Sequence, residues 1–250
     1  MYHFFVEPET VGEKEIVITN GDVNHIRNVL RMRPGEQIRI SDGQGRDYLC
    51  EIRQIGAEAV TAGILETETV ETELPARVIL FQGLPKSDKM ELIIQKCVEL
   101  GVAKVVPVVT ARTIVKLDPK KEERRRERWQ AIAESAAKQS GRSIIPEVAP
   151  VLRWEEALSQ AAACDLPLIP YELEEGMRGT AMAMQELRPG ITVAVMIGPE
   201  GGFEAKEIGE AVACGLRPVS LGRRILRTET AGLMILSVIG YLLESRAAEA

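Results

Sequence analysis

The first 70 residues contain short apolar stretches rich in β-branched residues, separated by turn-forming glycines. This pattern is typical of strands bounded by turns. It predicts five strands, at residues 4–6, 16–18, 37–41, 48–55 and 59–65. One helix is expected from Asp22 to Met32, with Asp22 as its N-cap and Val23, Ile26, Val29 and Leu30 on one face. Strands at this spacing indicate a small barrel or curled sheet.

The pattern changes after Glu71–Pro75, which we interpret as a linker. Strands are expected at residues 78–81, 105–109, 166–171, 191–197 and 218–221. Helices are expected at residues 87–100, 119–139, 154–163, 177–187, 204–214 and 230–245. Residues 191–197 do not alternate, which is typical of a central parallel strand buried on both faces. Because strands and helices alternate along residues 73–250, the sequence predicts an α/β domain with a mainly parallel sheet over this range.

Composition narrows the class of protein. The chain has 250 residues, of which 45% are hydrophobic and 27% charged, as in a soluble globular protein. Its four cysteines lack metal-ligand spacing and it has only two histidines, which argues against a disulfide framework or a metal site and favours the cytoplasm. No signal peptide is visible, and the apolar run at residues 231–243 is too short to span a bilayer.

The net charge of −6 argues at first against a nucleic-acid partner. Its distribution changes that picture. Residues 1–72 hold 7 basic and 13 acidic residues, a net of −6, whereas residues 77–154 hold 16 and 9, a net of +7. The densest part, Lys120–Arg128, mixes both signs at helical spacing. It is either a solvated helix face or a surface for phosphates.

The clearest local motif is a glycine turn, Gly198-Pro199-Glu200-Gly201-Gly202, which directly follows the buried strand. Ligands of open α/β sheets bind at the carboxyl ends of strands, and glycines let a backbone approach them closely. The alternative is a tight connection that binds nothing. The chain has neither GxGxxG nor GxxxxGK[ST], which disfavours a dinucleotide or P-loop site.

A second glycine turn, residues 220–231, follows the last strand and leads into the terminal helix. Thr228 or Thr230 can cap that helix, and Glu229 suits its positive end. Capping does not explain Arg223, Arg224 and Arg227, which oppose the helix dipole. These cations indicate an anionic partner such as phosphate.

Further basic groups lie near the ends of other elements. Residues 82–89 and 134–142 place Lys86, Lys89 and Arg142 beside turns, although such groups are often only solvated. In the small domain, His25, Arg27, Arg31 and Arg33 lie on or beside one helix, which favours a polyanion over ordinary solvated arginines. Hydrolytic chemistry has little support, because GxSxG and HExxH motifs are absent from the sequence.

Five segments together carry a family resemblance: HIRNVLRMRPGEQIRISDGQG, KSDKMELIIQKCVELGV, ERWQAIAESAAKQSGR, IGPEGGFEAKEI and LGRRILRTETA. In this order and spacing the chain resembles the 16S ribosomal RNA uracil-N3 methyltransferases of the SPOUT superfamily. The resemblance implies a PUA-like RNA-binding β-barrel over residues 1–72 and a SPOUT α/β domain with a trefoil knot over residues 73–250. It also implies a homodimer, S-adenosyl-L-methionine as methyl donor, and a uridine of 16S rRNA in the 30S subunit as substrate.

The resemblance also implies roles for individual residues. The donor pocket would be formed by Leu80, Gly83, Ile197, Gly198, Glu200, Gly201, Leu221, Gly222, Ile225, Leu226 and Ala231. RNA would be bound by His25, Arg27, Arg31, Arg33, Lys86, Lys89, Arg124, Arg142 and Arg224. Family members usually have an arginine close to the start, where this chain has His3, so RNA contact by the first strand would fall to that histidine.

The expected chemistry is methylation of a weakly acidic nitrogen. Arg227 is expected to stabilise the developing charge on the base or to hold its phosphate, and Glu229 and Glu200 are the candidates for the general base. Two other classes remain open from the residues alone. A non-catalytic RNA-binding module would keep the basic groups without needing converging glycine turns, and an ordinary nucleotide-binding protein would show a phosphate-binding fingerprint.

Overall fold

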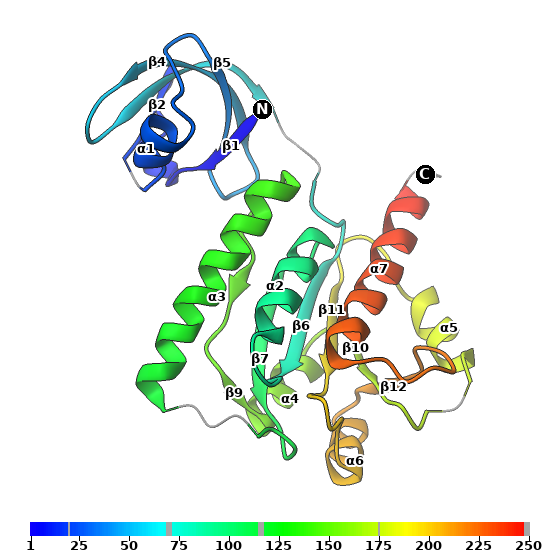
Figure 1. The fold of residues 1–250 in the computed structure, drawn as a ribbon. Coiled ribbons are helices and arrows are strands. Elements are labelled where there is room, and N and C mark those ends of the chain that lie inside the picture. Colours follow the sequence, from blue (N-terminus) through cyan, green and yellow to red (C-terminus); the bar gives the residue numbers. More distant parts are fainter. Residues whose placement is uncertain (20, 69–71, 115–117, 175, 248–250) are drawn as a thin grey trace. The chain divides into compact units, whose positions relative to one another are not determined.

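A computed structural model describes residues 1–19, 21–68, 72–114, 118–174 and 176–247. The chain divides into two compact units (Figure 1). The first comprises Met1–Glu73 with Ala137–Ile145, and the second comprises Leu74–Ala136 with Pro146–Ala250. Within the expected linker, Glu71 lies outside the described residues. The functional boundary after residue 72 stays a prediction.

The first unit is a curled mixed sheet of five strands (Figure 1). In sheet order the strands are β1 (Tyr2–Phe5), β3 (Gln37–Ser41), β4 (Asp47–Ile55), β5 (Val60–Glu68) and β2 (Glu15–Ile18). Only β1 and β3 pair in parallel, and the other pairs are antiparallel. Alternate residues such as Ile38 and Ile40 are fully buried in the core of this unit, as the period of two requires. All five predicted strands are therefore confirmed, and a short 3-10 helix, η1 (Pro8–Thr10), precedes β2.

The predicted helix at residues 22–32 differs from the expectation. It consists of α1 (Asp22–Asn24) and a π-helical turn, η2 (His25–Val29). Asp22 is not the N-cap, because Gly21 occupies that position and the Asp22 carboxylate pairs with the Lys138 ammonium at 3.0 Å. Val29 is 60% exposed rather than part of the core face, since a π turn changes which residues share a face.

The second unit contains a sheet in which every pairing is parallel. Its order is β12 (Arg217–Val219), β10 (Leu166–Pro170), β11 (Thr192–Ile197), β6 (Arg77–Gly83), β7 (Lys104–Val109) and β8 (Glu147–Val148), and β9 (Leu152–Arg153) also pairs with β7. The predicted α/β class is thus confirmed. The prediction that residues 191–197 form a central buried strand is confirmed too, because β11 lies between β10 and β6 and is buried on both faces. Strands β8 and β9 were not predicted, because two residues are too few to show a period.

Six helices connect and cover this sheet among the described residues (Figure 1). They are α2 (Lys89–Glu99), α3 (Pro119–Ser140), α4 (Trp154–Ala162), α5 (Arg178–Gln185), α6 (Ala205–Ala213) and α7 (Thr228–Ala247). Helix α7 packs on α2 and β11. Helix α2 begins two residues later than predicted, because Ser87 has a φ of 55° and cannot be helical. Helix α7 begins two residues earlier than predicted, at Thr228.

Candidate functional site

A cavity of about 450 Å³ lies beside the carboxyl ends of β10, β11 and β12. Its walls come from three connections that follow these strands, at residues 170–172, 197–203 and 220–228, together with Lys89 and Ala231. We call residues 198–203 the first glycine loop and residues 222–227 the second glycine loop. Parallel strands place their carboxyl ends at one edge, so segments far apart in the sequence meet there.

The glycines of these loops are required by close backbone contacts. A side chain at Gly83, the last residue of β6, would place its Cβ 2.7 Å from the backbone nitrogen of Pro199. A Cβ on Gly198 would lie 3.0 Å from the carbonyl carbon of Gly202. Gly202 and Gly222 have φ values of 66° and 102°, which favour glycine. The first glycine loop therefore folds tightly on itself and against the end of β6.

Thr228 connects the loops from inside. Its hydroxyl donates a hydrogen bond of 2.6 Å to the Gly198 carbonyl and accepts one of 2.9 Å from the Gln82 amide. The sequence predicted Thr228 or Thr230 as the cap of α7. In the structure the Thr228 hydroxyl joins Gly198 of the first glycine loop to Gln82 of β6. At the start of α7, the backbone N–H groups of Thr230 and Ala231 donate hydrogen bonds to the Arg227 carbonyl.

Three charged residues meet at the rim of the cavity. The Lys89 ammonium lies 3.2 Å from a carboxylate oxygen of Glu200 and 3.2 Å from one of Glu229. Burial alone would raise the pKa of Glu200, but backbone N–H donors, including that of Lys86, and the Lys89 ammonium together hold it below its ordinary value. Hydrogen bonds and charge from Glu229 and Glu200 outweigh desolvation and raise the pKa of Lys89. Lys89 and Glu200 are therefore charged at neutral pH.

The two candidate bases differ in position. Glu200 lines the cavity, whereas Glu229 does not. A carboxylate with a lowered pKa that already accepts several hydrogen bonds is a weak proton acceptor. Glu200 is thus arranged as an anchor for the first glycine loop, and Glu229 pairs with α2 rather than facing the cavity.

The arginines of the second glycine loop are open to solvent. Arg223, Arg224 and Arg227 all line the cavity and are exposed. Among the described residues no carboxylate is paired with any of them. Ile225, between them, is 86% exposed. The loop thus offers cations and an apolar side chain together at the mouth of the cavity.

The predicted donor-pocket residues are mostly brought together. Nine of the eleven line the cavity: Ile197, Gly198, Glu200, Gly201, Leu221, Gly222, Ile225, Leu226 and Ala231. Leu80 is fully buried beneath α7, 3.8 Å from where a Cβ on Gly232 would lie. Gly83 packs against Pro199. These two residues support the walls of the cavity from behind.

The predicted RNA contacts fall into two groups. His25, Arg27, Arg31 and Arg33 are exposed on or after η2, and Lys86 and Arg124 are exposed in the second unit. Arg142, in contrast, is only 3% exposed and pairs with Glu73. Lys89 is engaged by its two glutamates. Phosphate binding by these two residues stays a prediction, and in this structure both are held in ion pairs.

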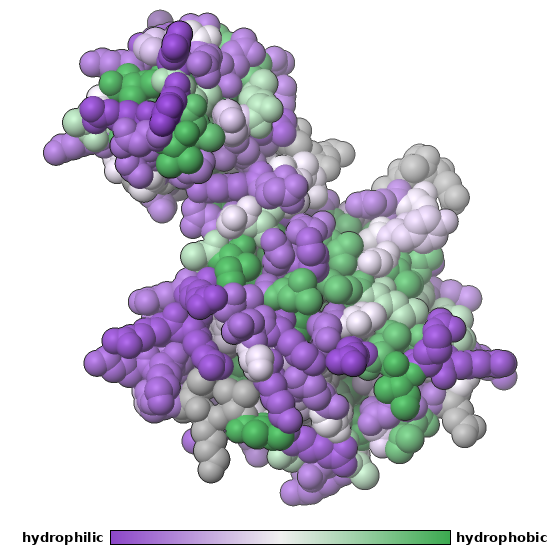
Figure 2. Space-filling view, in the orientation of Figure 1, coloured by the Kyte–Doolittle hydropathy of each residue, from purple (hydrophilic) through white to green (hydrophobic). Residues whose placement is uncertain are grey.

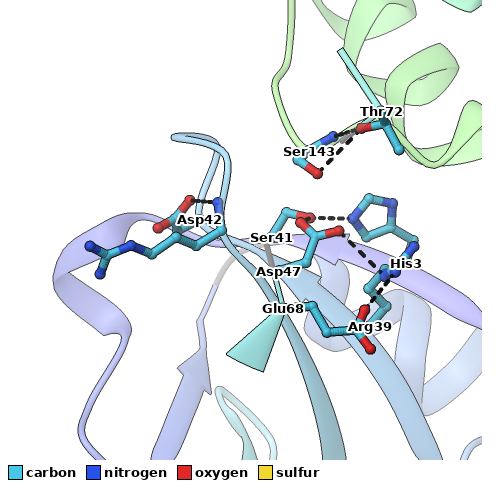
Figure 3. Close-up of polar contacts among 9 residues, drawn as sticks. His3, Arg39, Ser41, Asp42, Asp47, Glu68, Thr72 and Ser143 are labelled. Atoms are coloured by element: carbon cyan, nitrogen blue, oxygen red, sulfur yellow. Dashed lines mark hydrogen bonds and ion pairs between the residues drawn. The ribbon is translucent and has the colours of Figure 1, made fainter. Parts of the chain in front are cut away.

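His3 is also engaged within its own unit (Figure 3). Its Nε2 lies 2.6 Å from the Ser41 hydroxyl, which donates to the buried Asp47 carboxylate. Arg39 pairs with Asp47 and Glu68 on the other side of this network. Burial outweighs the attraction of Asp47 and lowers the pKa of His3, so the ring is mostly neutral at pH 7. The His3 side chain is therefore packed within the first unit.

Sequence reasoning missed several supporting residues. The Arg112 guanidinium donates to the Gly201 carbonyl. Glu207 accepts from the backbone N–H of Ala111 at 2.9 Å and from that of Glu204 at 2.8 Å. The spacing of Glu204 and Glu207, three residues apart at a helix start, is the signal that could have identified Glu207. Glu172, an acidic residue that lines the cavity after β10, has no comparable signal.

Among the described residues, none of the helices combines the length and the apolar character that a membrane span needs. No group of three or more histidine, cysteine or acidic side chains there is arranged to hold a metal ion.

Comparisons with known proteins agree along nearly the whole chain. Residues 72–240 match the model of the RNA methyltransferase domain, and residues 18–65 match that of the RNA methyltransferase PUA domain. Ribosomal RNA small subunit methyltransferase E of Bacillus subtilis is 39% identical over 236 residues, covering 91% of this chain and 90% of its own. Its counterpart in Synechocystis is 36% identical over 98% of this chain and 78% of its own.

A solved structure is similar as well. The ribosomal RNA small subunit methyltransferase E of Neisseria gonorrhoeae, bound to S-adenosyl methionine, has a TM-score of 0.83 and 34% identity. The similarity covers 97% of this chain and 98% of that one.

Proposed function

The chain belongs to the ribosomal RNA small subunit methyltransferase E family, and from this premise we propose that it transfers a methyl group from S-adenosyl-L-methionine to N3 of a uridine in 16S rRNA. The observation that carries the proposal is the cavity enclosed by the two glycine loops. The bacterial relatives carry the methyltransferase name, and the Neisseria structure contains the donor.

The cavity has the size and lining that this donor requires. Its volume of about 450 Å³ lies within the range of about 300–1,000 Å³ typical of small-molecule sites. Glycine backbone at Gly198, Gly201 and Gly222 alternates with the apolar side chains of Ile197 and Leu221. Backbone N–H and C=O groups can hydrogen-bond the edge of adenine while the apolar side chains contact its ring. When bound, S-adenosyl-L-methionine supplies a methyl group on a positively charged sulfur that leaves as a neutral thioether.

Charge stabilisation is the main task of the protein in this reaction. N3 of uracil carries a proton at neutral pH and becomes nucleophilic as that proton leaves. We assign Arg227 to stabilise the negative charge that develops on the base, because this residue lines the cavity and is exposed. An arginine does not itself serve as the base, since it remains protonated.

Two carboxylates are candidates for the general base that removes the N3 proton. Glu200 lines the cavity but has a lowered pKa, and Glu229 does not line it. Of the two, we retain Glu229 as the candidate base, because it lies in the first turn of α7, two residues after Arg227. Glu200 is assigned to holding the first glycine loop.

The RNA contacts that the proposal uses are exposed basic side chains. They are His25, Arg27, Arg31 and Arg33 in the first unit, and Lys86, Arg124 and Arg224 in the second. We propose that residues 1–72 act as the RNA-binding domain and residues 73–250 as the methyltransferase domain, with the loops threaded as a trefoil knot. The substrate is the 30S subunit, and the reaction takes place in the cytoplasm.

A homodimer completes the proposal. Helices α2 and α7 pack on one another and still expose the apolar side chains Leu92, Val238 and Tyr241. Hydrophobic residues gather over this part of the second unit in Figure 2. Such a surface fits a second copy of the chain.

Thermal unfolding with added ligands tests the proposal. A ligand that binds only the folded state at about 100 times its dissociation constant stabilises it by about 2.7 kcal/mol. S-adenosyl-L-methionine and S-adenosylhomocysteine are expected to raise the melting temperature, and ATP and NAD are not. Stabilisation by ATP or NAD alone would instead support an ordinary nucleotide-binding protein.

A further inference from the structure

We propose that Lys89 is a positioning residue, which fixes the two glycine loops of the donor cavity by binding Glu200 and Glu229 at the same time. The inference rests on the proposed function, because it assigns a role to a residue of that site. Lys89 is the first residue of α2, Glu200 belongs to the first glycine loop, and Glu229 lies in the first turn of α7, directly after the second.

The contacts join three segments that are far apart in the sequence. The Lys89 ammonium lies 3.2 Å from Glu200 Oε1 and 3.2 Å from Glu229 Oε2. The backbone N–H of Lys86, three residues earlier, donates to both carboxylate oxygens of Glu200, at 3.1 and 3.3 Å. The segment after β6 thus holds Glu200 by backbone and side chain together, and reaches α7 through the same lysine.

This arrangement differs from an ordinary surface ion pair. The side chains of Lys89 and Glu200 are each 28% exposed and that of Glu229 is 17% exposed, so solvent screens them only in part. By comparison, Lys96 and Glu99 pair three residues apart on the same helix. That pair lies within a single helix, whereas Lys89 connects loops.

The charges make the lysine hard to replace. One ammonium stands between two carboxylates, so removing it leaves two like charges as close neighbours in a partly buried place. Arg227 lies two residues before Glu229 but lines the cavity, and among the described residues it forms no ion pair with either carboxylate. The loops would separate or the carboxylates would bind protons, and either change would alter the cavity.

Two sets of contacts hold the glycine loops, an inner set on their buried side and an outer set at the rim of the cavity. Thr228 joins Gly198 and Gln82 on the buried side of the loops, and Lys89 joins Glu200 and Glu229 at the rim. Both contacts line the donor cavity, the inner one through Thr228 and Gly198 and the outer one through Lys89 and Glu200. Because the outer contact is partly exposed to solvent, its loss is expected to weaken donor binding more than it lowers stability.

The test compares Lys89→Met, Lys89→Arg and the matched control Lys96→Met, which removes the equivalent charge from the same helix. For each variant, calorimetry gives the donor dissociation constant, and steady-state assays give kcat and KM for the donor. Lys89→Met is expected to raise the dissociation constant about tenfold, which corresponds to about 1.4 kcal/mol. Lys89→Arg is expected to recover most of that affinity, and Lys96→Met to bind as the wild type does.

A double variant separates positioning from loss of packing. Glu229→Gln removes one of the two carboxylate charges, so Lys89→Met/Glu229→Gln is expected to bind the donor more tightly than Lys89→Met alone. Additive losses, or equal losses in Lys89→Met and Lys96→Met, would overturn the proposal. So would wild-type donor affinity in Lys89→Met.

Amide hydrogen exchange provides a readout that needs no donor. In Lys89→Met, exchange at residues 198–203 and at the start of α7 is expected to accelerate about tenfold, with α5 unchanged. If the wild type fails to bind the donor, the proposed function fails while the exchange measurement still tests the role of Lys89. Unchanged exchange in both segments would contradict that role.

Discussion

The side-chain amide of Gln82 donates a hydrogen bond of 2.9 Å to the hydroxyl of Thr228, 146 residues further along the chain. The same hydroxyl donates to the Gly198 carbonyl at 2.6 Å. One buried hydroxyl therefore connects the end of β6, the first glycine loop and the start of α7. These are the three segments on which the donor cavity depends.

Replacing Thr228 by valine preserves the shape of the side chain and removes the hydroxyl. The Gly198 carbonyl and one amide N–H of Gln82 lose their partner, and an unsatisfied buried polar group costs about 1–3 kcal/mol. We expect the free energy of unfolding to fall by about 2 kcal/mol in urea titration. Thr230→Val, at an exposed position of the same helix turn, is the control; equal losses in both variants would refute this role of Thr228.

Two glycine substitutions are expected to have opposite effects. Gly83→Ala would bring a Cβ within 2.7 Å of Pro199, so the first glycine loop must shift, and both donor affinity and melting temperature should fall. Gly209→Ala lies inside α6 with no heavy atom within 4 Å of the new Cβ, and should stabilise the fold by about 0.5–1 kcal/mol. Differential scanning fluorimetry on both variants compares them directly. A Gly83→Ala protein as stable as wild type would show that the close approach is dispensable.

Arg227 and Arg224 are expected to differ in kinetics. If Arg227 stabilises charge on the base, Arg227→Ala should lower kcat by about 10²-fold or more at saturating RNA. Arg224→Ala should instead raise KM for RNA and reduce the salt dependence of binding by about one unit of slope. Methyl transfer at the wild-type kcat by Arg227→Ala would remove that residue from the chemistry.

The lowered pKa of Glu200 makes its contribution to stability depend on pH. Its carboxylate is stabilised in the folded state relative to the ordinary value of 4.5, so the contribution is fully present above that value and is lost as the pH falls through the folded-state pKa. The difference in melting temperature between wild type and Glu200→Gln should therefore be largest near pH 7 and shrink below about pH 4.5. A difference that is constant from pH 7 to pH 4 would contradict this assignment.

Most helices and strands could be predicted from the sequence, because the spacing of the apolar residues and the positions of the turn-forming residues indicate the same elements. The run at residues 191–197 predicted a central buried strand, and β11 is that strand. The prediction of one regular helix at residues 22–32 was wrong, because a π-helical turn changes which side chains share a face without changing the amino-acid composition. Strands β8 and β9 exist only through pairing with β7, which no local pattern records.

The glycine loops of the candidate site could be predicted from the sequence, but the ion pairs of its charged residues could not. Gly198, Gly201 and Gly222 line the cavity as the motifs indicated. The ion pairs of Arg142 and Lys89 were not predictable, because a sequence does not show that Glu73, Glu200 and Glu229 fold against them. Which cations stay exposed depends on tertiary pairing and not on the spacing of basic residues.

The most direct test of the account is nucleoside mass spectrometry of 16S rRNA from cells that lack this protein. The account predicts that one 3-methyluridine disappears and that purified protein with S-adenosyl-L-methionine restores it on 30S subunits from those cells. Addition of Arg227→Ala under the same conditions should restore little of it. Persistence of 3-methyluridine in 16S rRNA of the deleted cells would contradict the proposed function.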